Sequence, residues 1–201
     1  MALGFNTENK SGGDILPIIK YDAKAGDFII VDRSQNADGQ WGKNESELTL
    51  PVKVAMDLEN IEVGWLSFST GIPDFQMAKI GEPMPAKPSD EHKQAFRVKI
   101  GSKDLGLREF SHSAKTVLKR MDELHTIYMT EKSSNEGKMP IIEISGTDTV
   151  KIQSPNGELR FKEPVWKITG WTDRPEMFDV SAAAASAPEP AAQTTDEDPL
   201  F

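Results

Sequence analysis

A short basic segment in the middle of the chain carries the clearest chemical pattern. It reads Lys93-Gln-Ala-Phe-Arg-Val-Lys-Ile100. Side chains alternate between the two faces of a strand, so an extended conformation places Lys93, Arg97 and Lys99 on one face and apolar residues on the other. Neighbouring positions on one face are roughly 7 Å apart, since each residue rises by ~3.4 Å. This segment therefore predicts a strand whose outer face can bind an extended chain of phosphates.

The charge of the chain is unevenly distributed, and the basic segment lies in its most positive part. The formal net charge is -9, which alone disfavours a polyanionic ligand. Residues 87–120, however, hold nine basic and four acidic side chains, a local net charge of +5. Lys103 and Arg108 belong to this window and extend the predicted DNA-binding surface. The alternative is that these cations form an ordinary solvated strand face.

Aromatic residues near the cations are candidates for stacking on nucleobases. Trp41 lies in the polar segment Gly39-Gln-Trp-Gly-Lys43, which predicts an exposed turn and a base-stacking role. The alternative is that Trp41 folds back over the mouth of a barrel. Phe110 and His112 alternate with Arg108, so the three share one face if that segment is extended. We expect them to form a second stacking site.

These residues must be positioned by a framework rich in strands. Short apolar or alternating runs recur between turn signals, which is typical of an antiparallel barrel or sandwich. The predicted strands are 28–31, 48–58, 61–68, 95–100, 141–145, 149–153 and 159–171. The sequence Ser154-Pro-Asn-Gly157 predicts a hairpin turn between the last two strands. Most of the aromatic residues in these strands are expected in the core and one or two are expected to be exposed; the five are Trp65, Phe68, Phe161, Trp166 and Trp171.

One segment has the periodicity of a helix. From Ser113 to Met129, apolar residues recur every three or four positions, which predicts an amphipathic helix of about four turns. Ser111 or Ser113 is expected to cap it. Strands, one helix and further strands follow the order of the OB barrel, whereas a seven-stranded sandwich more often lacks the helix. We predict a mainly β fold, an OB-like Greek-key barrel with one amphipathic helix and a disordered acidic C-terminal tail.

The last 21 residues differ in composition from the rest of the chain and contain no Lys or Arg. Small residues and prolines dominate residues 181–195, which are expected to form a flexible linker. We therefore expect a folded domain over residues 1–180 and a disordered linker and tip over residues 181–201. The tip is predicted to bind a partner protein and to compete with DNA, through Asp196, Glu197, Asp198, Leu200 and Phe201.

Several classes of site are disfavoured by composition. The chain has no Cys, which excludes disulfides, thiolate zinc sites, iron–sulfur clusters and thiol nucleophiles. His92, His112 and His125 do not form a metal-ligand motif. We expect no cofactor, no metal and no enzymatic activity. No apolar run reaches the length of a membrane span and no signal peptide is evident, so a cytoplasmic protein is expected.

The whole arrangement resembles the single-stranded DNA-binding proteins of bacteriophages. The specific similarity is the acidic tip, Asp196-Glu-Asp-Pro-Leu-Phe201; a looser similarity lies in Pro164-Val-Trp-Lys-Ile-Thr-Gly-Trp171. The chain departs from the bacterial proteins by a strand-rich insertion before the basic strand and by its acidic domain.

This resemblance implies sequence-independent binding of single-stranded DNA in phage DNA replication, recombination and repair, in the cytoplasm of a bacterial host. It also implies that the tip recruits replication proteins such as DNA polymerase, primase or helicase. Two alternatives belong to other classes. One is a noncatalytic phage structural or adaptor protein, and the other is a nuclease or recombination enzyme that uses carboxylates and magnesium.

Overall fold

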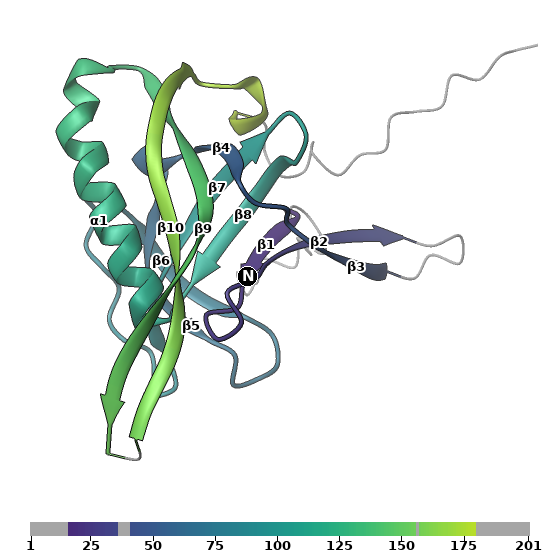
Figure 1. Ribbon diagram of the computed structural model, residues 1–201, viewed down its shortest axis with the longest axis vertical. Helices are drawn as coiled ribbons and strands as arrows, with labels where there is room; N and C mark the ends of the chain where they lie inside the picture. Colours follow the sequence, from purple (N-terminus) through teal and green to yellow (C-terminus); the bar gives the residue numbers. More distant parts are fainter. Residues whose placement is uncertain (1–15, 36–40, 156, 180–201) are drawn as a thin grey trace, which may run out of the picture.

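The structure is a computed structural model that describes residues 16–35, 41–155 and 157–179. It is mainly β with one α-helix (Figure 1), which confirms the predicted fold class. The strands are β1 (Ile18–Tyr21), β2 (Phe28–Gln35), β3 (Trp41–Glu47), β4 (Val52–Met56), β5 (Glu62–Ser67), β6 (Asp74–Lys79), β7 (Lys93–Ser102), β8 (Gly106–His112), β9 (Lys138–Ser154) and β10 (Gly157–Asp173). The helix is α1 (Lys115–Glu131), and three short 3-10 helices are η1 (Leu58–Asn60), η2 (Lys132–Ser134) and η3 (Glu176–Phe178).

The strand pairing is consistent with an OB-like barrel. β4 and β5 flank η1 and both pair with β7, so together they act as one bent first strand. β7 then pairs with β8, the first strand also pairs with β9, and β9 pairs with β10. α1 connects β8 to β9, which corresponds to the helix between the third and fourth strands of the barrel.

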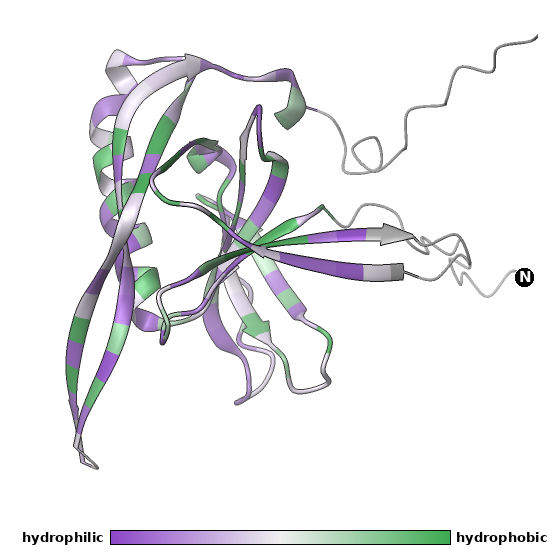
Figure 2. Ribbon diagram, turned by 45° about the vertical axis from the view of Figure 1, so that its right-hand side comes forward, coloured by the Kyte–Doolittle hydropathy of each residue, from purple (hydrophilic) through white to green (hydrophobic). Residues whose placement is uncertain are grey.

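Two additions distinguish this chain from a minimal five-stranded barrel. β6 pairs with β5 and forms a hairpin inserted before β7. At the other side, β1 pairs in parallel with β8 and continues the sheet through β2 to β3. β2 and β3 project away from the barrel, and much of their coloured length is hydrophilic (Figure 2).

The core lies between the inner faces of the strands and one face of α1. That helix face consists of Val117, Met121, Leu124 and Tyr128, which are all buried. The helix begins two residues later than predicted, and its N-cap position is Ala114, which has no side-chain oxygen. The predicted cap by Ser111 or Ser113 is therefore wrong. Instead, the Ala114 backbone N–H donates to Nδ1 of His112 at 2.9 Å.

The long β9–β10 hairpin extends past the barrel at the opposite end from η3 (Figure 1). Its strands pair from Lys138 opposite Asp173 to Ser154 opposite Gly157, so the predicted hairpin at Ser154–Gly157 is confirmed. The two predicted strands 141–145 and 149–153 form the single strand β9. The predicted linker and tip, including Asp196, Glu197, Asp198, Leu200 and Phe201, lie outside the described residues.

Candidate nucleic-acid interface

The basic segment forms β7, and its side chains divide between two faces as predicted. Phe96, Val98 and Ile100 point into the core and are at most 2% exposed. Lys93 is exposed on the other face, and Arg97 and Lys99 are partly exposed there. This outer face of β7 is therefore separated from α1 by the core of the barrel.

Acidic residues on the neighbouring strands accompany these cations. Arg97 lies opposite Glu62 of β5, and its Nε donates to Glu62 Oε2 at 2.5 Å. Glu109 of β8 lies opposite Lys99, and its Oε2 is 3.9 Å from Arg97 Nε. The basic row is thus partly neutralised by carboxylates. The sequence of β7 alone cannot reveal these partners, because they lie 35 and 12 residues away from Arg97 in the chain.

A polar depression of about 430 Å³ opens on this outer face. Its cations come from β6, β7 and the segment after β10, and its carboxylates from η1's N-terminal side, β5 and β8. The charged lining residues are Lys79, Arg97, Lys99, Arg174, Asp57, Glu62 and Glu109. Four cations and three carboxylates line the depression. The net charge of its lining is therefore positive, although several of these groups form ion pairs with one another.

Burial changes the titration of the groups at the centre of the depression. Burial raises the pKa of the Glu109 carboxyl, although the charges of Arg97 and Lys99 act in the opposite direction. Burial disfavours the charge of Arg97, but its hydrogen bond to Glu62 and the charge of Glu109 together raise its pKa. Arg97 therefore stays charged, and Glu109 takes up a proton at a higher pH than an exposed glutamate does.

The segment after β10 closes one end of the depression. Arg174 Nη2 donates to Asp57 Oδ2 at 2.9 Å, and Asp57 is only 2% exposed. Arg174 Nε also donates to Asp179 Oδ1 at 2.6 Å. Phe178 packs in a small apolar cluster with Leu16 and Leu107, on the same side of the sheet. Arg174 thus holds the segment in place. Within the described residues Lys79 and Lys99 form no ion pair, so they are the cations of the depression that are more available to a ligand.

The predicted stacking site at Phe110 is wrong. Phe110 is 1% exposed, and its ring centroid lies 5.6 Å from that of Phe96 and 6.2 Å from those of Phe28 and Trp166. Arg108, Phe110 and His112 do share a face of β8, but it is the inner face of the barrel. An aromatic ring in this position stabilises the core and is inaccessible to a base.

The charged neighbours of Phe110 satisfy their polar groups within the protein. Arg108 is 9% exposed, and its Nη1 donates to Asp32 Oδ1 at 2.6 Å. His112 accepts the helix-cap hydrogen bond at Nδ1, so its Nε2 donates to the Tyr21 carbonyl oxygen at 3.2 Å. Burial lowers the pKa of His112. Both side chains therefore act in folding at the barrel rim, whereas Lys103 is exposed in the β7–β8 turn.

Trp41 belongs to a strand and not to the predicted turn. It begins β3 and pairs with Gln35 of β2. The side chain of Trp41 is outside the described part of the structure, so its stacking on a base stays a prediction.

The inserted β5–β6 hairpin adds aromatic residues that sequence reasoning did not assign to the site. The Cζ atom of Arg97 lies 5.1 Å from the centroid of the Phe75 ring on β6. Phe68, directly after β5, is 62% exposed, in keeping with the expectation that one or two aromatic residues of these strands are exposed. The signal that could have found them is the insertion itself, since an added hairpin next to a basic strand enlarges its surface.

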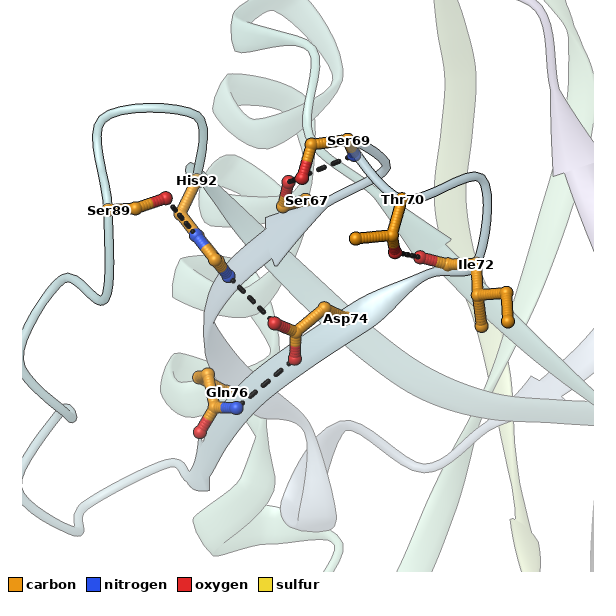
Figure 3. A network of polar contacts seen from close by, with 8 residues as sticks. All are labelled: Ser67, Ser69, Thr70, Ile72, Asp74, Gln76, Ser89 and His92. Atoms are coloured by element: carbon orange, nitrogen blue, oxygen red, sulfur yellow. Dashed lines mark hydrogen bonds and ion pairs between the residues drawn. The ribbon is translucent and has the colours of Figure 1, made fainter.

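A polar network holds this hairpin to the loop that precedes β7 (Figure 3). His92 lies between Ser89 and Asp74, with Nδ1 at 2.8 Å from Ser89 Oγ and Nε2 at 3.3 Å from Asp74 Oδ2. The His92 backbone N–H also donates to the Ser89 carbonyl oxygen at 3.2 Å. Ser89 and His92 therefore close a local turn, and the imidazole fastens that turn to β6.

Within residues 16–35, 41–155 and 157–179, no cluster of three or more His, Asp or Glu side chains is placed to hold a metal ion. No helix in this part of the chain is long and apolar enough to cross a membrane. Comparison with known protein families, curated proteins and solved structures found no match to the chain.

Proposed function

We propose that this protein binds single-stranded DNA without reading its sequence and without catalysing a reaction. The observation that carries the proposal is the polar depression on the outer face of β7, where Arg97 and Lys99 lie in an OB-like arrangement. In OB folds, the face of the second and third strands and the adjoining loops bind oligonucleotides. β7 and β8 occupy these positions here. The proposed setting is phage DNA replication, recombination and repair in the cytoplasm of a bacterial host.

The charge pattern supports weak and salt-sensitive binding of phosphates. Lys79, Lys93, Arg97 and Lys99 lie on the same face of the β6–β5–β7 sheet, as their cross-strand register requires. If these cations neutralise about four phosphates, the slope of log K against log salt should be near -3, from ~0.7 per phosphate of a single strand. Glu62 and Glu109 limit the affinity, because a phosphate at Arg97 must compete with both.

The proposal also includes a partner-binding role for the C-terminal tip, residues 196–201, and this role rests on the sequence alone. Asp196, Glu197 and Asp198 suit a basic rim on a partner protein, and Leu200 and Phe201 suit an apolar pocket within it. The proposed partners are replication proteins such as DNA polymerase, primase or helicase.

The test is a titration of labelled oligo-dT with the full chain in EDTA, followed by fluorescence anisotropy over a range of salt concentrations. Lys99→Gln should weaken binding and make the salt slope shallower by ~0.7. Lys119→Gln is the matched control, because Lys119 is exposed on α1, on the other side of the core.

Equal affinity for duplex and single strand would contradict the proposal, as would equal effects of the two lysine substitutions. Absence of binding to any oligonucleotide would favour the alternative, a noncatalytic phage structural or adaptor protein. Cleavage of the oligonucleotide when magnesium replaces EDTA would favour the nuclease alternative.

A further inference from the structure

We propose that the β5–β6 hairpin extends the single-strand interface and that Phe68, at its tip, stacks on an unpaired base. This inference rests on the proposed function and adds a binding residue outside the predicted basic row. It replaces the buried Phe110 as an aromatic platform.

The first observation is the exposure of Phe68. Its side chain is 62% exposed, whereas every other aromatic side chain that the structure describes is buried or half-buried. It follows Ser67, the last residue of β5 in register with β6, and Ile72 at the same tip is also exposed. Within the described residues this apolar tip has no packing partner. Packing inside the protein therefore does not explain why its side chains are apolar.

The second observation is that the tip is internally braced (Figure 3). The Gly71 N–H donates to the Phe68 carbonyl oxygen at 3.0 Å, and Thr70 Oγ1 donates to the Ile72 carbonyl oxygen at 3.3 Å. The Ser69 N–H donates to Ser67 Oγ at 3.2 Å. A turn held in this way has little conformational freedom left to lose when a ligand binds, which favours affinity.

The third observation is continuity with the polar depression. Leu66 lies opposite both Lys93 and Phe75, and Glu62 lies opposite Arg97, so all five share the outer face. Phe68 lies six positions after Glu62, a distance of about 20 Å along an extended chain at ~3.3 Å per residue. One extended single strand can therefore follow β5 and β7 from the depression, past Lys93, to the tip.

The chemistry of the tip favours a nucleobase over another apolar group. Every base presents a π-face, so an exposed ring beside a row of cations binds a single strand without sequence preference. Duplex DNA buries its bases in the stack and cannot offer them to a ring on a strand edge. The same geometry therefore accounts for a preference for single strands.

The experiment compares oligo-dT with an abasic deoxyribose phosphate oligomer of equal length, which keeps the phosphates and removes the bases. Phe68→Leu keeps an apolar side chain without the ring, and Phe68→Tyr keeps the ring. Met129→Leu is the control, since Met129 is exposed on α1. Phe68→Leu should weaken oligo-dT binding by about 5- to 150-fold, the range for loss of one stacked base. Phe68→Tyr and Met129→Leu should bind as the unmodified protein does.

The abasic oligomer separates the two claims. If Phe68 stacks on a base, Phe68→Leu should bind the abasic oligomer as the unmodified protein does. Unchanged oligo-dT binding by Phe68→Leu, or equal losses for both oligomers, would overturn the stacking role and leave the proposed function standing. If the unmodified protein binds neither oligomer, the proposed function fails and the inference fails with it.

Discussion

Glu62 forms an ion pair with Arg97, the central cation of the candidate interface. Removing the charge of Glu62 gives a quantitative prediction. Glu62→Gln keeps the size of the side chain and removes the charge that lies 2.5 Å from Arg97 Nε. A carboxylate about 5 Å from a bound phosphate repels it by about 1 to 3 kcal/mol, for dielectric constants from that of water down to ~20. The Glu62 and Arg97 side chains are 30% and 31% exposed, so solvent screening places the effect at the lower end.

We therefore expect Glu62→Gln to bind oligo-dT roughly five- to tenfold more tightly at low salt, from about 1 to 1.5 kcal/mol. The gain should shrink as salt is added, because salt screens partly exposed charges. Loss of the ion pair should cost at most about 1 kcal/mol of folding stability, which thermal unfolding can check.

Glu123→Gln is the matched control for this assay. It makes the same change in net charge and also removes an Arg–Glu pair, between Arg120 Nη1 and Glu123 Oε2 at 2.9 Å on α1. Its effect on DNA affinity should be small because α1 lies on the other side of the core. Equal tightening by both variants would attribute the effect to net charge alone, and unchanged or weaker binding by Glu62→Gln would refute the reasoning.

Three further predictions concern other parts of the chain. Burial raises the pKa of Glu109, so Glu109 loses its negative charge at a higher pH than an exposed glutamate does. The affinity for oligo-dT should therefore rise on mild acidification. Glu109→Gln should reduce this pH dependence in anisotropy titrations. Phe110→Ala should lower the free energy of unfolding by about 3 to 5 kcal/mol in urea titrations, because a ring that is 1% exposed leaves a cavity; an unchanged midpoint would contradict its place in the core. Deletion of residues 192–201 should strengthen DNA binding at low salt and abolish partner capture, whereas deletion of Phe201 alone should lose the partner with DNA affinity unchanged.

The elements with strong apolar periodicity could be predicted from the sequence. The alternation of Phe96, Val98 and Ile100 identified β7 and its inner face. α1 was predicted within two residues at each end, because its buried positions recur at helical spacing. β3 was missed because Trp41-Gly-Lys-Asn-Glu-Ser-Glu47 is almost entirely polar. Its strand conformation depends on pairing with β2, which composition does not reveal.

The candidate site was predictable only in part, for a related reason. Strand alternation assigns Arg108 and Phe110 to one face but does not say whether that face is inside or outside the barrel. The charge of Arg108 suggested the outside, yet its ion pair with Asp32 lets it lie at the rim of the inner face. Glu62, Glu109 and Phe75 join the site through cross-strand register, which depends on the tertiary fold.

The central claim is that the outer face of β7 binds single-stranded DNA, and amide chemical-shift mapping tests it most directly. The full chain, labelled with nitrogen-15, would be titrated with oligo-dT in EDTA. We predict that the largest shifts fall on Lys93–Lys99, on Glu109 and on the β5–β6 hairpin, while α1 changes little. Shifts concentrated on α1, or none at saturating oligo-dT, would contradict it.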